Sequence, residues 1–230
     1  MNRLALALPL LAVVAACSDP EPAPEPTPTA TVAAPRTLVA ADLDLASLGA
    51  KIVGPQGPQV ETDLSAANRM VGQMTSFVAC PKDAQECVPG SMPEGTLYTY
   101  VHRVTLAEAD AAPEQPTEGP EVVETPPTLF RTTAPAHGFS GAVGYSKADA
   151  ENALGDPEAI TISIDSGQLI WRVTEGEGWK PGTTLTFWWQ STLPPAGPAE
   201  SYLLEVDGNQ SVASGPFPAE DKPVEGSKAR

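Results

Sequence analysis

Ile160–Val173 reads ITISIDSGQLIWRV, and this stretch decides the fold. Isoleucine recurs at positions 160, 162 and 164 with polar residues between, which is the period of two of a strand with one buried face. Asp165-Ser166-Gly167 has the composition of a tight turn, and the apolar run Leu169–Val173 follows it. The stretch therefore predicts a β-hairpin.

Strand signals continue on both sides of this hairpin. Leu97–Val104 (LYTYVHRV) and Thr184–Gln190 (TLTFWWQ) are rich in aromatic and β-branched residues, which favour strands. Tyr202–Val206 alternates, and Asp207-Gly208-Asn209 turns the chain back into Ser211–Ala213, which predicts a second hairpin. Many short strands with Gly and Pro between them predict an all-β fold, mainly an antiparallel β-sandwich.

One short helix is expected, near residues 147–154. Ser146 directly precedes this stretch, and Asp149 comes three residues after Ser146, which is the spacing of a capping box. Several alanines favour a helix, and Gly155 suits the left-handed position just past a helix end.

Three other segments are less regular. Leu38–Ala79 fits either strand or helix and is assigned short strands, and Leu193–Pro198 (LPPAGP) is expected to be a loop. Residues 107–127 are acidic and rich in proline, so they cannot bury enough apolar area to offset their ordering entropy. This run either separates two domains or is a loop within one. A single domain over 37–217 is preferred, because a first part of ~70 residues would be small for an independent core.

The N-terminus carries an apolar run, Leu4–Ala16, after Arg3 and before Cys17. The run is shorter than the ~20 residues of a membrane-spanning helix, but it has the positive start, apolar centre and small final residues of a secretory signal. Its end, VAAC at 14–17, resembles the lipobox of bacterial lipoproteins. The resemblance implies a signal peptide over 1–16 and a lipid on Cys17. An ordinary secretory signal with an incidental cysteine is the alternative.

The lipoprotein resemblance also implies a location. In Gram-negative lipoproteins an Asp directly after the modified cysteine favours retention at the inner membrane, whereas Ser18 occupies that position here. The outer membrane is therefore expected, and the inner membrane is less favoured. Residues 17–36 are rich in proline and predict a disordered, extended tether. Residues 218–230 are expected to form a flexible tail.

Two cysteines remain beyond the signal, Cys80 and Cys87, in the run CPKDAQEC. Their number is even, and they lie close together in the sequence. In an oxidising compartment this predicts a disulfide. A metal site or a redox pair is less favoured, because no histidine is near in the sequence and the spacing is not that of a CxxC motif.

The charge excludes some partners. The chain has 13 basic and 29 acidic residues and a formal net charge of −16. Such a chain is not expected to bind nucleic acid or an anionic lipid surface by charge. Contact with the membrane is therefore expected through the lipid on Cys17, and no cofactor is predicted.

No catalytic or metal-binding motif stands out. Gly138–Ala142 (GFSGA) and Gly144–Ala148 (GYSKA) each miss the last glycine of a G-x-S-x-G elbow, so their glycines are better assigned to turns or close packing. His102 and His137 are far apart in the sequence and form no ligand pair. The aspartates lack the spacing of a calcium loop; those considered are Asp42, Asp44, Asp63, Asp165 and Asp207. An enzymatic function stays open but is not favoured.

Four aromatic residues are candidates for a binding surface. Trp188 lies on the face of its strand opposite the apolar one, and Trp179 lies in a glycine-rich turn. Tyr98 and Tyr100 are second choices. Exposed rings stack on sugars or pack on protein partners. The alternative is that the sandwich buries these rings, because tryptophan is usually highly buried.

These features together predict a lipid-anchored envelope protein of a Gram-negative bacterium, a non-catalytic module that binds an envelope protein or a glycan. One alternative is a purely structural lipoprotein that spaces the layers of the envelope. Another is a hydrolase of envelope or extracellular polymers, or the accessory subunit of such an enzyme.

Overall fold

The computed structural model describes residues 34–54, 58–108 and 128–220. Several predicted features lie wholly or mostly outside these residues. They are the signal peptide 1–16, the lipidated Cys17, the tether 17–36, the acidic run 107–127 and the tail 218–230.

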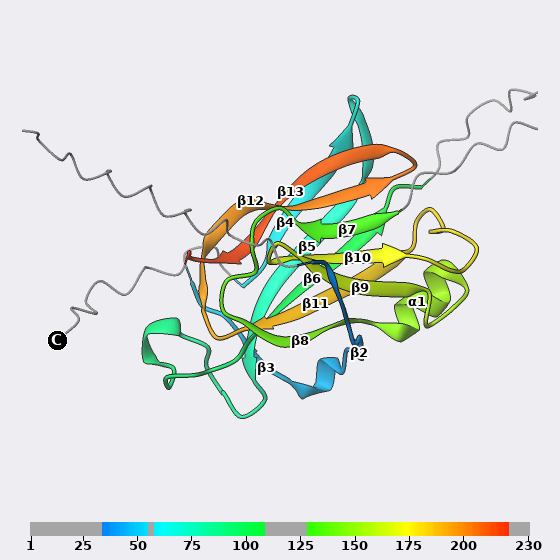
Figure 1. Cartoon of the computed structure of the whole chain (residues 1–230). Coiled ribbons are helices and arrows are strands. Elements are labelled where there is room, and N and C mark those ends of the chain that lie inside the picture. The colour runs from blue at the N-terminus through cyan, green and yellow to red at the C-terminus, as the bar shows by residue number, and fades with distance from the viewer. Residues whose placement is uncertain (1–33, 55–57, 109–127, 221–230) are drawn as a thin grey trace, which may run out of the picture. The chain divides into compact units, whose positions relative to one another are not determined.

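The described residues form two β-sheets that pack face to face (Figure 1), so the predicted all-β sandwich is confirmed. In sheet A the strand order is β1 (Arg36–Leu38), β9 (Ile160–Asp165), β10 (Gln168–Val173), β7 (Leu129–Thr132), β12 (Pro195–Val206) and β13 (Asn209–Pro218). In sheet B the order is β2 (Ala41–Asp42), β8 (Phe139–Tyr145), β11 (Thr184–Ser191), β6 (Tyr98–Leu106), β5 (Arg69–Pro81) and β3 (Leu48–Lys51), and β4 (Val60–Ala66) also pairs with β5. The strand pairs are antiparallel except β2 with β8.

The two predicted hairpins are present. In the β9–β10 hairpin Asp165 pairs with Gln168, and both turn residues have positive φ, as a two-residue type I′ turn requires. The β12–β13 hairpin turns in the same way at Asp207 and Gly208. A third hairpin joins β4 and β5. The segment Leu38–Ala79, which fitted either strand or helix, is therefore mostly strand, with a 3-10 turn at Leu45–Ser47.

The predicted loop at 193–198 is partly wrong, because β12 begins at Pro195. Proline cannot donate to a strand partner, so it is confined to strand edges and bulges. Near its start β12 pairs with β13 alone, with Pro195 opposite Pro218, because β7 joins only at Tyr202–Glu205. No strand of the described residues pairs with the other side of β12 there, and this leaves room for prolines.

One helix, α1 (Lys147–Leu154), is present as predicted, and it lies at one end of the sandwich (Figure 1). Its first turn is capped by Ser146, whose Oγ accepts a hydrogen bond from the Asp149 amide at 3.1 Å. It ends at Gly155, which has a φ of 81°. The remaining helical elements that the structure describes are two 3-10 turns, η1 (Leu45–Ser47) and η2 (Pro89–Ser91).

The interior of the sandwich is aromatic. Phe130 of sheet A stacks on Phe187 of sheet B with ring centroids 4.7 Å apart, and Trp171 packs against both. The Trp171 indole donates a hydrogen bond to the Gly144 carbonyl at 2.9 Å, so its polar atom is satisfied inside the core.

Strands from both sides of the acidic run 107–127 share one sheet. β6 precedes the run and β11 follows it, and the two strands pair over eight residues from Thr184–Thr105 to Ser191–Tyr98. The run therefore connects strands of the same sandwich.

Candidate functional site

The four candidate rings are buried, which is the alternative that the sequence left open. The exposed fraction is 7% for Trp188, 8% for Trp179, 3% for Tyr98 and 0% for Tyr100. Tyr98 and Tyr100 belong to the apolar core between the two sheets. Tyr100 stacks on Trp189 at 4.5 Å and donates its hydroxyl proton to the Leu193 carbonyl. Burial also raises the pKa of the Tyr100 hydroxyl above its usual range.

Trp188 points away from the core, as the alternation predicts, but it is covered. β11 is an internal strand, so Trp188 has neighbours on both sides, Val101 of β6 and Gly144 of β8. A Cβ placed on Gly144 would lie 2.8 Å from the indole nitrogen, so the ring lies closely over this glycine. The nitrogen has no hydrogen-bond partner within the described part of the chain.

Trp179 closes one end of the core. Its ring meets Phe187 edge to face at 6.2 Å, and its indole donates to the Thr183 carbonyl at 3.3 Å. The small part of the ring that remains exposed faces a surface groove, which makes Trp179 the one predicted binding residue that lines it.

This groove, of about 680 Å³, is the candidate functional site of the described residues. Four chain segments meet there: the start of β5, the end of β6, the Trp179 loop and the turn between β12 and β13. The buried or half-buried members are Val71, Leu106, Ala107, Trp179 and Val206. The exposed members are Asn68, Arg69, Met70, Glu108, Pro181 and Asp207.

The groove thus has a largely aliphatic inner wall and a charged rim. Within the described residues the ion pairs are Lys147–Glu158 and Lys180–Glu177, so the rim charges of Arg69, Glu108 and Asp207 are not ion-paired there. Met70 is 56% exposed, and methionine adapts its shape to irregular apolar contacts. Such a surface can receive an apolar group and hold a charged one beside it.

The two histidines have separate surroundings. His102 is fully buried, hydrogen-bonds through Nδ1 to the Ser76 hydroxyl at 2.9 Å, and packs 4.1 Å from the Tyr202 ring. Burial lowers the pKa of His102 to about 3. His137 is half-buried and meets Phe217 edge to face at 6.3 Å. In residues 34–54, 58–108 and 128–220 no group of three or more His, Cys, Asp or Glu side chains is placed to hold a metal ion.

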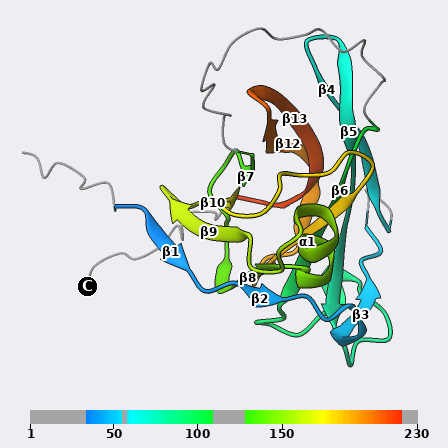
Figure 2. The same cartoon turned by 90° about the vertical axis from the view of Figure 1, so that its right-hand side faces the viewer.

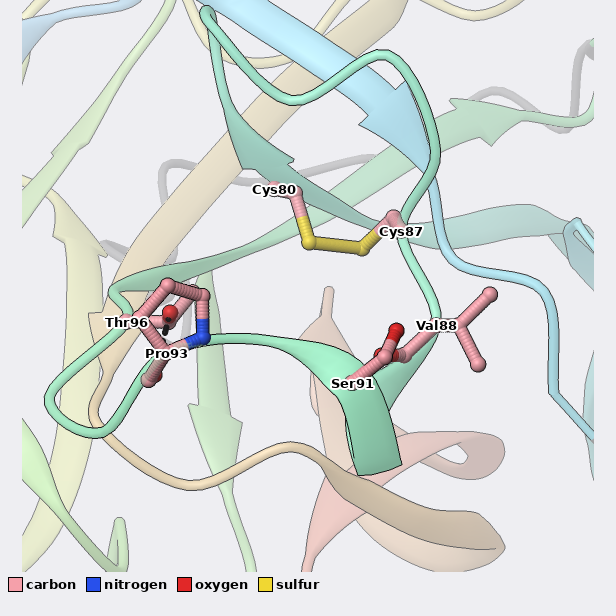
Figure 3. Close-up of a disulfide and its surroundings, with 6 residues drawn as sticks. All are labelled: Cys80, Cys87, Val88, Ser91, Pro93 and Thr96. Carbon is pink, nitrogen blue, oxygen red and sulfur yellow. Dashed lines mark hydrogen bonds between the residues drawn. A yellow bond between two sulfur atoms is a disulfide. The ribbon is translucent and has the colours of Figure 1, made fainter.

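Cys80 and Cys87 form a disulfide with the sulfur atoms 2.08 Å apart (Figure 3), as their spacing predicts. Both residues are fully buried. Cys80 lies near the end of β5, and Cys87 forms a bridge to Ile52. The disulfide therefore closes the loop after β5 onto the end of that strand, and the backbone bridge places Cys87 beside the chain segment before β4.

The loop that follows the disulfide is held by its own side chains. The Ser91 hydroxyl donates to the Val88 carbonyl at 3.0 Å, and the Thr96 hydroxyl donates to the Pro93 carbonyl at 2.7 Å (Figure 3). Val88 is 38% exposed.

The aspartates and glycines singled out in the sequence have local structural roles. Asp42 accepts hydrogen bonds from the amides of Leu43 and Lys147, and Asp44 caps η1. Asp165 and Asp207 lie at hairpin turns. Gly144 is needed for close packing, since a Cβ there would lie 1.8 Å from the Ala41 carbonyl oxygen.

No protein-family model matches this chain, and no curated protein and no solved structure matches it either. None of the helices in the described ranges combines the length and apolar character needed to cross a bilayer.

Proposed function

We propose that the chain is a lipid-anchored envelope protein of a Gram-negative bacterium, and that its β-sandwich binds another envelope protein through the groove without catalysing a reaction. The groove carries this proposal, because it joins an aliphatic wall to rim charges that are free of ion pairs among the described residues. A concave apolar surface with a few polar groups is the usual form of a binding site.

A protein partner fits the groove better than a glycan. Sugar rings stack on exposed aromatic faces, and only 8% of the Trp179 surface is exposed. The wall is instead built from Val71, Leu106 and Val206, which suit an apolar side chain. The rim carries two carboxylates, Glu108 and Asp207, and one guanidinium, Arg69, so it is negative on balance. The whole chain has a net charge of −16. We therefore propose a partner segment that carries an apolar side chain beside a basic residue.

The anchor is proposed from the lipobox resemblance. A diacylglycerol thioether on Cys17, with an acylated amino group, would place several acyl chains in the outer membrane, and more than one chain gives stable anchoring. Because β1 begins at Arg36, the proposed polyproline-II tether covers residues 17–35 and would extend about 60 Å at ~3.1 Å per residue. That length would hold the groove clear of the lipid surface.

A photo-crosslinking amino acid at position 70 tests the groove in the membrane-anchored protein. Val53 is the control position, since it is 66% exposed and follows Ile52, whose amide bonds to Val78 at the opposite end of β5 from the groove. We expect one discrete product from position 70, attached to a partner peptide with apolar and basic residues, and no such product from position 53. Equal products from both positions, or attachment to a glycan, would contradict the proposed partner.

The anchor needs its own test, because it can fail independently of the groove. Cys17→Ser should abolish palmitate labelling and release the protein from the membrane fraction. Normal labelling of this variant would contradict lipidation at Cys17.

A further inference from the structure

We infer that residues 36–47 form a strap, which joins the two sheets along one edge of the sandwich and opens as a local unit while both sheets stay folded. The strap comprises β1, β2 and η1 with the residues between them. In Figure 2 it runs from the edge of sheet A at β9 to the edge of sheet B at β8.

The pairing of the strap is short. β1 pairs with β9 over three residues, and β2 pairs with β8 over two. Val39, between the two strands, is 91% exposed, and no residue of the strap is fully buried. Leu38 and Ala40 are the strap residues that pack against the core, and both are only half-buried. Segments with few buried apolar contacts open locally at lower free energy than the core strands.

Two contacts hold the strap, one to α1 and one to sheet B. The Asp42 carboxylate accepts a hydrogen bond from the Lys147 amide at 2.9 Å, at the first residue of α1. The Ala41 carbonyl lies against Gly144 so closely that a Cβ on that glycine would be 1.8 Å from the oxygen. The absence of a side chain at position 144 is therefore what lets the strap approach β8.

The opposite side of the sandwich is closed differently. There β13 of sheet A packs on β4, and the Thr62 hydroxyl donates to the Ser214 carbonyl at 2.7 Å. Opening of the strap leaves that side intact. It makes β9 and β8 edge strands, one in each sheet, whose outward backbone groups are then free to pair with another strand.

The strap begins directly where the proline-rich tether ends. A pull on the anchor would therefore act on β1 before any other strand, and this consequence rests on the proposed function. The local opening itself needs no lipid, so it can be tested on the unlipidated chain.

Hydrogen–deuterium exchange of Gly144→Ala tests the strap. Gly90→Ala is the matched control, because a Cβ on Gly90 meets nothing within 4 Å. We expect Gly144→Ala to speed exchange over residues 36–47 by about tenfold or more, while β5 and β13, which do not contact position 144, exchange as in the parent. Equal strap exchange in the two variants would overturn the inference, as would equal acceleration in every strand.

Asp42→Ala provides a second variant in case Gly144→Ala does not fold. Losing a charge-assisted hydrogen bond should also speed strap exchange by about tenfold. Unchanged exchange over residues 36–47 in Asp42→Ala would overturn the inference as well.

Discussion

Acidification should destabilise this protein through His102. The ring is fully buried against Ser76, Phe130 and Tyr202, and burial lowers its pKa to about 3, against 6.5 for an exposed histidine. Above pH 6.5 the ring is neutral in both the folded and the unfolded chain. Below pH 6.5 the unfolded chain binds the proton first, so the free energy of unfolding falls until the pH reaches about 3.

The size of the effect follows from the width of this window. Each pH unit within it removes about 1.4 kcal/mol from the free energy of unfolding. Between pH 7.5 and pH 5 the loss amounts to about 2 kcal/mol, since only the part below pH 6.5 contributes fully. That is a large share of the free energy of unfolding of a typical domain, which is roughly 5–15 kcal/mol.

Urea unfolding at pH 7.5 and pH 5, followed by tryptophan fluorescence, measures this loss. Glutamine does not titrate, so the loss in His102→Gln should be smaller than in the parent by about 2 kcal/mol. The carboxylates and His137 are present in both proteins, so their contributions cancel. His137→Gln is the matched control substitution, because it replaces the other histidine, which lies outside the buried surroundings of His102. The same pH dependence in the parent and in His102→Gln would refute the reasoning.

Two further predictions concern the disulfide and the aromatic core. Replacing both Cys80 and Cys87 by alanine should lower the free energy of unfolding by about 2.5 kcal/mol, the chain-entropy value for a loop of this length. Denaturant titration measures this loss, and an unchanged unfolding midpoint would contradict a stabilising disulfide. All four tryptophans should resist quenching by acrylamide, because none is more than 8% exposed. Strong quenching of the native protein would show that at least one ring is open to solvent.

Local features of the fold could be predicted because neighbouring residues determine them. The isoleucine alternation and the DSG turn predict the β9–β10 hairpin, and Ser146 with Gly155 marks both ends of α1. The β4–β5 hairpin was not singled out, because its turn residues, Ala67 and Asn68, include no glycine. Its only local turn signal is Asn68, which tolerates positive φ better than most residues.

The groove could not be predicted, because its residues come from four separate segments that the two sheets bring together. Whether Trp188 is exposed or buried could not be decided from the sequence, for a related reason. Alternation along β11 gives the correct face for this residue, but its cover depends on β6 and β8 as neighbours. Sequence periodicity carries no information about which strands those are.

The intact mass of the protein extracted from its native membranes tests the proposed anchored module most directly. The account predicts a chain that starts at Cys17 and carries the added mass of a diacylglycerol thioether and an amide-linked acyl chain, with Cys80 and Cys87 oxidised. A chain that begins at Met1, or one without acyl mass at its amino end, would contradict it.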